Sequence, residues 1–339
     1  MLKQPDLKNQ RIIACLREAY GLSVDQVAFL PIGADSKAAV YRVVADDGTP
    51  YFLKLKKGLF DETSLALTKF LGDQDIRPII APLTTKAGQL WTTFDAWSAI
   101  LYPFIEGQNG YEVMLSDHHW GEFGVALRSI HALELPSALA RRIRPESYSP
   151  QWRDTVKMFL EHIDEHGSGD PVAKRTAAFL MSKHDEILFL VGRAEELALV
   201  LQARSPEFVL CHADIHAGNV LINNDDAFYI VDWDEAILAP KERDLMFIGG
   251  GLMGHWYSPQ EEESLFFRAY GQTSIDLVGL AYYRYERIIE DIAVICEQIF
   301  SVTGGAEDRE QSFRWLVSNF RPNHTIELAY RVDRTLRDG

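Results

Sequence analysis

Hydrophobic positions change their spacing about a third of the way along the chain. Up to about residue 104 they mostly alternate with polar residues, as in half-buried β-strands, and after Gly110 they recur every three or four positions, as in amphipathic helices. The strands expected in the first part are residues 27–30, 39–44, 51–55, 90–94 and 97–101. The pattern predicts an α+β fold with a β-rich N-terminal part and a larger, mainly helical C-terminal part.

Helices are predicted where apolar residues share one face and a turn or cap residue marks an end. Ile12, Leu16 and Tyr20 are four apart, which indicates a short helix that ends near Gly21. Asp61 is the expected cap of a second helix. Later helices are expected over residues 120–130, from 152, from 170 and over 282–294.

One polar segment lies between two short apolar runs. Residues 211–219 read Cys-His-Ala-Asp-Ile-His-Ala-Gly-Asn, and a further apolar run at 228–231 is expected to pair back across a turn. That pairing would bring Asp232 to the same end as Asp214 and Asn219. Carboxylate and amide oxygens suit Mg²⁺, and a carboxylate suits the acceptance of a hydroxyl proton.

The spacing of these residues is that of a kinase catalytic loop: His-x-Asp-x-x-x-x-Asn, then an Asp at the end of the next strand. Protein kinases have Arg at the place of Ala213 and Gly at the place of Asp234, so the departures favour small-molecule kinases. One alternative is a metal hydrolase, because His212, Asp214 and His216 would share one face of an extended strand. An inactive nucleotide-binding module is another alternative.

Residues 212–219 resemble the catalytic loop of the aminoglycoside phosphotransferase family. The likeness extends over most of the chain, and within the family it is greatest to members that act on aminocyclitols. The segments that carry it are residues 1–5, 232–235, 238–251 and 283–294. The resemblance implies a two-lobed, protein-kinase-like fold, with a nucleotide-binding lobe at 1–104 and a catalytic and acceptor-binding lobe at 105–339.

The resemblance also implies a reaction: transfer of the γ-phosphoryl group of ATP, with Mg²⁺, to a hydroxyl of a small cationic acceptor such as an aminocyclitol or aminoglycoside antibiotic. Asp214 would be the catalytic residue, with His212 as a structural brace, and Asn219 and Asp232 would bind the metal ion. A metabolic kinase for a sugar, an amino alcohol or a homoserine-like acceptor is the alternative, and a preference for GTP stays open.

Lys54, in the third strand, is expected to contact the α- and β-phosphates. It sits between apolar residues in Phe-Leu-Lys-Leu, as the phosphate-contacting lysine of the kinase fold does. Glu62, in the first turn of the next helix, is its expected partner. Lys56 and Lys57 are expected to be solvated.

Two further segments are nucleotide-binding candidates. The loop 32–36 occupies the place of the phosphate-covering hairpin of kinases, where Ser36 could contact phosphate, although a plain hairpin tip is an equal alternative. Residues 102–107 resemble the hinge between kinase lobes. By that register the Pro103 carbonyl and the Ile105 N–H would meet adenine.

The helix predicted at 282–294 is expected to form an acidic wall of the acceptor site, with a solvated helix face as the alternative. Glutamates four residues apart lie on one face, and an acceptor with ammonium groups needs such anions. The candidate acceptor-binding residues are Asp234, Glu235, Tyr283, Glu286 and Glu290. Arg287 and Asp291 are expected to form an ion pair beside them.

Composition and charge limit the partners and the compartment expected for the protein. The formal net charge of −15 over 339 residues repels nucleic-acid phosphates and attracts a cationic ligand, although solubility alone also favours such a charge. The three cysteines have no disulfide or zinc spacing, which fits a reducing compartment. Early charges and the lack of a long apolar run argue against a signal peptide or a membrane span. We expect a cytoplasmic monomer or weak homodimer with neither nucleic-acid nor membrane partners.

Overall fold

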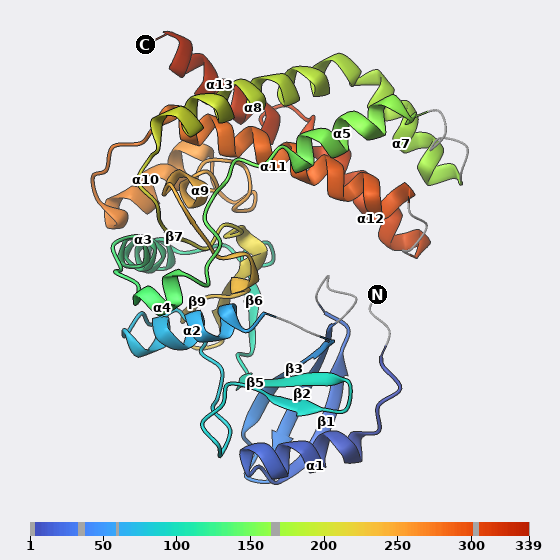
Figure 1. Ribbon diagram of the computed structural model, residues 1–339, viewed down its shortest axis with the longest axis vertical. Helices are drawn as coiled ribbons and strands as arrows, with labels where there is room; N and C mark the ends of the chain where they lie inside the picture. Colours follow the sequence, from blue (N-terminus) through green and yellow to red (C-terminus); the bar gives the residue numbers. More distant parts are fainter. Residues whose placement is uncertain (1–3, 33–37, 59–60, 164–169, 301–304, 339) are drawn as a thin grey trace. The chain divides into compact units, whose positions relative to one another are not determined.

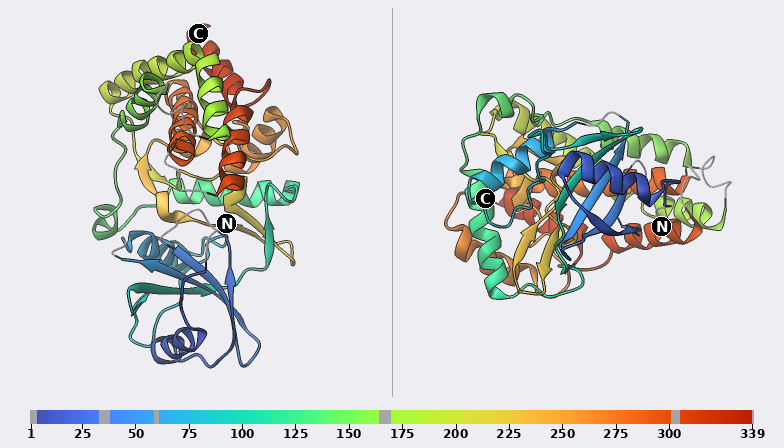
Figure 2. Two further views of the ribbon diagram at one scale, coloured as in Figure 1. Left: turned by 90° about the vertical axis from the view of Figure 1, so that its right-hand side faces the viewer. Right: turned by 90° about the horizontal axis from the view of Figure 1, so that it is seen from below.

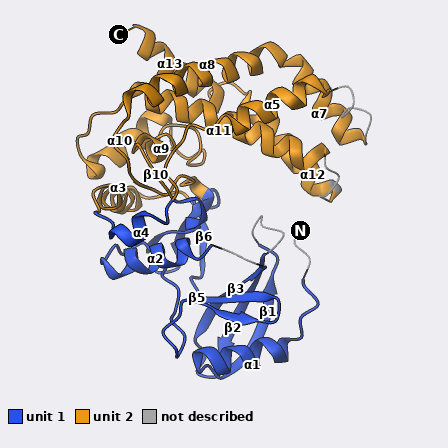
Figure 3. Ribbon diagram, viewed as in Figure 1, with its two compact units in different colours: residues 1–113, 134–143, 218–236 blue, residues 114–133, 144–217, 237–339 orange. Residues whose placement is uncertain are grey.

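The computed structural model describes residues 4–32, 38–58, 61–163, 170–300 and 305–338. Its contacts divide the chain into two compact units (Figure 3). Unit 1 comprises residues 1–113, 134–143 and 218–236, and unit 2 comprises residues 114–133, 144–217 and 237–339. The lobe boundary expected after residue 104 stays a prediction.

Unit 1 is built on a five-stranded antiparallel sheet in the order β1-β2-β3-β5-β4 (Figure 1). The strands are β1 (Val24–Leu30), β2 (Ala38–Ala45), β3 (Pro50–Lys57), β4 (Thr92–Phe94) and β5 (Trp97–Pro103). Helix α1 (Asn9–Tyr20) buries Ile12 and Leu16 in a core that also holds Leu53 and Leu55 of β3. Gly21 ends the helix in the left-handed region, at φ 73°. The predicted strands and this helix are confirmed.

The rest of unit 1 contains two short helices and a second antiparallel sheet in the order β6-β8-β9. These elements are α2 (Thr63–Asp73), α4 (Ser137–Ala140), β6 (Gly107–Asn109), β8 (Val220–Asn223) and β9 (Phe228–Ile230). The predicted cap of α2 is one residue off: Glu62 is at the N-cap position and makes no side-chain cap bond, whereas Asp61, just before it, accepts the N–H of Thr63 (2.9 Å). Gly107 lets β6 approach β8, because a Cβ there would lie 2.3 Å from the Ile222 carbonyl oxygen.

Unit 2 is mainly helical (Figures 1 and 2). Its helices are α3 (Asp117–His131), α5 (Gln151–Glu161), α7 (Pro171–Ser182), α8 (His184–Arg204), α9 (Glu242–Leu245), α10 (Pro259–Tyr270), α11 (Leu277–Phe300), α12 (Ala306–Asn319) and α13 (Thr325–Asp338). The short strands β7 (Val209–Cys211) and β10 (Ile237–Ala239) pair with each other. Helix α11 packs against α5, α8, α12 and α13.

The apolar stripes of the unit 2 helices face its interior, as predicted. Trp120, Phe123 and Leu127 of α3 are buried, and α3 packs against α10. Ile288 and Ile292 of α11 are buried as well. None of the described helices combines the length and the apolar composition that crossing a bilayer requires.

Candidate active site

The hairpin β8-β9 brings the two candidate metal ligands together within unit 1. Asn219 immediately precedes β8 and Asp232 follows β9, and the pairing of Val220 with Ile230 sets both residues at one end of the hairpin. A backbone hydrogen bond from the Val231 N–H to the Asn219 carbonyl (2.9 Å) closes that end. Asp232 is exposed and left-handed at φ 62°, a conformation that aspartate tolerates better than most residues. The arrangement supplies two oxygen donors of the kind Mg²⁺ prefers.

In unit 2, the loop after β7 is held by a buried carboxylate that the sequence alone did not assign. The two oxygens of Asp244, at the end of α9, accept the N–H groups of His212 (2.9 Å) and Ala213 (2.7 Å). Ala213 has a φ of 70°, a strained conformation for alanine that these bonds help to maintain. The His212 ring is buried, and its Nδ1 accepts the N–H of Asp214 (3.3 Å). His212 therefore lies where the predicted brace of the loop would lie.

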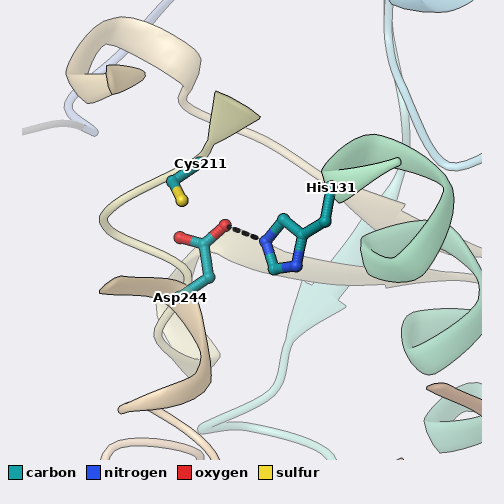
Figure 4. Close-up of side chains that lie close together, drawn as sticks. All are labelled: His131, Cys211 and Asp244. Carbon is teal, nitrogen blue, oxygen red and sulfur yellow. Dashed lines mark hydrogen bonds and ion pairs between the residues drawn. The ribbon is translucent and has the colours of Figure 1, made fainter. Parts of the chain in front are cut away.

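Asp244 belongs to a buried group that Figure 4 shows with His131 and Cys211. Within the described ranges, these are the three candidate metal-ligating side chains whose ligand atoms lie within 4.8 Å of one another. Both nitrogens of His131 have partners, Asp244 (3.1 Å) and the Tyr270 hydroxyl (2.8 Å). Burial, reinforced by Asp244, raises the pKa of the Cys211 thiol well above its ordinary value, so it stays protonated. The group thus supports the loop after β7, since the ligand atoms of His131 and Asp244 already have partners.

The metal-hydrolase alternative needs residues 212–216 to be an extended strand. The structure has no strand there, and the buried His212 ring is engaged with the backbone of Asp214. His216 contacts Asp214 instead: its Nε2 lies 3.6 Å from Oδ2 of that carboxylate. The geometry that would favour a hydrolase is therefore missing from this part of the chain.

Asp214 is bound by an arginine from helix α11. Arg287 Nη1 donates to Asp214 Oδ1 (2.5 Å), and Arg287 Nε donates to Asp291 (3.0 Å), so the predicted ion pair between Arg287 and Asp291 is confirmed. Burial acts to raise the pKa of Asp214, but His216 and Arg287 outweigh it and hold that pKa well below its ordinary value. Asp214 is therefore ionised at neutral pH and fixed in position.

The structure gives Lys54 a different partner from the one predicted. Lys54 Nζ lies 3.1 Å from Asp234 Oδ2, and Lys56 Nζ lies 2.7 Å from the same oxygen. The Glu62 carboxylate accepts instead from Trp91 Nε1 (2.7 Å) and lies 3.5 Å from Arg142. The expectation that Lys56 is solvated was wrong, because its side chain is 17% exposed.

Two further nucleotide-binding candidates lie at the end of strand β5. Pro103 is the last residue of β5, and Ile105 follows it, half-buried. The N–H of Phe104, between them, donates to the Pro50 carbonyl (3.3 Å), which continues the pairing with β3. Ser36 lies outside the described residues.

The predicted acidic wall is only partly placed to meet an acceptor. Tyr283 has no exposed surface, and Glu286 is 6% exposed with Oε2 3.6 Å from Nε of Arg153 on α5. These two residues therefore face the interior of unit 2, where the Tyr283 ring lies 5.6 Å from Arg243 of α9 and Glu286 meets α5. Glu290 is half-buried and Glu235 is exposed, and both stay candidates. Asp234 is engaged by the two lysines.

Comparisons with known proteins give the family of the chain. A sequence model of the phosphotransferase enzyme family (APH) matches residues 28–287. The chain belongs to this phosphotransferase family. Its members' chemistry confirms the predicted reaction class, phosphoryl transfer to a small-molecule hydroxyl.

Similar solved structures cover nearly the whole chain. Spectinomycin phosphotransferase APH(9)-Ia, crystallised with ADP and spectinomycin, is 38% identical, with a TM-score of 0.89 over 97% of this chain and 99% of that one. Its AMP-bound complex is 37% identical, with a TM-score of 0.84 over 95% of this chain and 98% of that one. The amicoumacin kinase hAmiN is 15% identical, with a TM-score of 0.60 over 97% of this chain and 94% of that one, and shares the fold. The predicted kinase-like fold class is confirmed.

Proposed function

We propose that this phosphotransferase transfers the γ-phosphoryl group of ATP to a hydroxyl of spectinomycin or of a closely related aminocyclitol. The observation that carries the acceptor assignment is the 38% identity, over almost the full length of both chains, to an enzyme crystallised with ADP and spectinomycin. The acidic composition, with a net charge of −15, supports a cationic acceptor. The cytoplasm is the proposed location.

Asp214 is proposed as the residue that orients the acceptor hydroxyl and accepts its proton. The contacts from Arg287 and His216 support this role, because they keep the carboxylate ionised and restrict its rotation. Asp244 supports it indirectly, since it fixes the backbone of the two preceding residues. Phosphoryl transfer asks little covalent chemistry of the protein, so accurate placement of the hydroxyl supplies much of the rate.

Asn219 and Asp232 are proposed as the Mg²⁺ ligands. Their side-chain oxygens are hard donors, and the hairpin closure at Val231 keeps the two residues at one end of β8-β9. Bound Mg²⁺ neutralises the charge that develops on the phosphate oxygens. Lys54 is proposed to contact the α- and β-phosphates, and residues 103–105 to bind adenine through the backbone.

Helix α11 is proposed to contribute the acidic side of the acceptor site. Its residue Arg287 contacts Asp214, so the catalytic loop and this part of the helix are neighbours within unit 2. Glu290 lies three residues further along the same helix and keeps partial exposure. Charged hydrogen bonds from the acceptor's ammonium groups to such carboxylates are stronger than neutral ones.

The test is to incubate the purified protein with MgATP and spectinomycin and to measure the mass of the acceptor. A gain of one phosphate group is expected, and Asp214→Asn should lower the turnover by about 100-fold or more while nucleotide binding persists. Parallel reactions with kanamycin, choline and a simple sugar measure selectivity. If one of these is phosphorylated with a higher kcat/KM than spectinomycin, the acceptor assignment is wrong. If neither spectinomycin nor any of these compounds is phosphorylated although ATP binds, the acceptor lies outside these classes.

A further inference from the structure

The carboxylate of Asp234 joins three separate elements of unit 1. Asp234 lies in the short helical turn η2 (Trp233–Glu235) that follows the β8-β9 hairpin. Its Oδ2 meets Lys54 Nζ (3.1 Å) and Lys56 Nζ (2.7 Å), both from β3. Its Oδ1 accepts the hydroxyl of Ser64, in the first turn of α2 (2.9 Å). We call Lys54, Lys56, Ser64 and Asp234 the Asp234 clamp.

Strand geometry explains why two lysines reach the same oxygen. Residues two apart on a strand point to the same side of the sheet, and β3 is fixed between β2 and β5 by pairing on both edges. The side chains of Lys54 and Lys56 are 22% and 17% exposed, well below what free surface lysines show. Two ammonium groups this close repel each other, and the shared carboxylate offsets that repulsion.

Glu62 is not the carboxylate that binds Lys54 and Lys56. Both of its carboxylate oxygens have other partners, Trp91 and Arg142, and its side chain is half exposed. Asp234, by contrast, has contacts on both oxygens from residues of β3 and α2.

We infer that Asp234, rather than Glu62, is the positioning residue for Lys54, and that Lys56 is a second cation held ready for the nucleotide's phosphates. The inference rests on the proposed function in one respect, namely that the ligand is a nucleoside triphosphate. Ser64 extends the effect to α2, because the same carboxylate fixes the first turn of that helix. A carboxylate two residues after the metal-binding Asp232 therefore orders the phosphate-binding lysines.

The experiment compares two isosteric substitutions, Asp234→Asn and Glu62→Gln. Each removes a negative charge with almost no change of volume. The dissociation constants for ATP and for adenosine are measured by calorimetry without acceptor, and kcat and KM for ATP with it. Asp234→Asn should lower kcat/KM for ATP by about 10- to 100-fold, the range expected for loss of charged hydrogen bonds. Its affinity for adenosine should not change, since adenosine has no phosphate.

Lys56→Met tests the second cation, with Lys57→Met as its matched control. Lys57 neighbours Lys56 on the same strand but is exposed, on the other side, near the Trp97 ring (5.9 Å). Lys56→Met should weaken ATP binding by about 10-fold, Lys56→Arg should restore most of it, and Lys57→Met should leave it unchanged.

Three outcomes would overturn the inference. The first is a larger loss of ATP affinity in Glu62→Gln than in Asp234→Asn. The second is an equal loss of ATP and adenosine affinity in Asp234→Asn, which would mean a general structural role. The third is wild-type ATP affinity in Lys56→Met. Because ATP binding is measured without acceptor, a failure to phosphorylate spectinomycin would refute the acceptor assignment but not the inference about Asp234.

Discussion

Replacing Arg287 by methionine should destabilise unit 2 and disturb the proposed catalytic aspartate together. Arg287 is the cation between two carboxylates, Asp214 at 2.5 Å and Asp291 at 3.0 Å. Methionine keeps much of the side-chain volume but leaves both carboxylates facing each other without the cation. Removal of one partner from a buried ion pair costs about 3–5 kcal/mol.

The exposed fractions place this case at the lower end of that range. The side chains of Arg287, Asp214 and Asp291 are 19%, 26% and 25% exposed, so solvent screens the unpaired charges in part. We therefore expect Arg287→Met to lower the free energy of unfolding by about 3 kcal/mol. The turnover should fall as well, by about 10-fold or more, because Asp214 would no longer be held in one orientation.

Urea unfolding followed by circular dichroism measures the stability, with Arg314→Met as the matched control. Arg314 is 67% exposed and lies 4.0 Å from Glu310 on the same helix, so its loss should cost less than about 0.5 kcal/mol. In an Asp214→Asn background, Arg287→Met should lower the free energy of unfolding by at least about 1 kcal/mol less than in the wild type, because only one unpaired carboxylate is left. A cost for Arg287→Met no greater than that for Arg314→Met, or no coupling with Asp214, would refute this reasoning.

Three further predictions concern the metal, the acceptor and pH. Asp232→Ala should weaken MgATP binding by about 10-fold or more but leave metal-free ATP binding unchanged, because it removes a proposed anionic ligand of Mg²⁺. Equal losses of affinity with and without Mg²⁺, measured by calorimetry, would indicate a folding defect instead. Glu290→Gln should raise the acceptor KM by about 10- to 100-fold in steady-state kinetics while the KM for ATP stays the same, and an unchanged acceptor KM would place the acidic wall elsewhere. Burial raises the pKa of Glu286 from 4.5 to about 7, so the stability it contributes is complete below pH 4.5 and is lost as the pH rises through 7. Glu286→Gln cannot titrate and should flatten the loss of stability measured by urea unfolding between about pH 5 and about pH 8; an unaltered pH dependence would contradict the assignment.

The sequence by itself determined the elements whose cause is local. The alternation of apolar residues placed the strands of the five-stranded sheet, and a four-residue spacing followed by Gly21 placed helix α1. The end of the β8-β9 hairpin was also predictable, since Asn219 and Asp232 flank two short strands that are joined by a short turn and pair with each other. In each case the interacting residues are close together along the chain, so their spacing carries the information.

Only the tertiary structure decided which charged groups far apart in the sequence became partners. Lys54 and Asp234 are 180 residues apart, and Arg287 and Asp214 are 73 apart, so no periodicity links them. Glu62 shows the limit of local reasoning: its place at the start of α2 suggested a lysine partner, but packing set Trp91 and Arg142 beside it. A long charged side chain can reach in many directions from its backbone position. Its partner is therefore fixed by which distant segments the fold brings within about 3 Å, the distance at which a charged hydrogen bond forms.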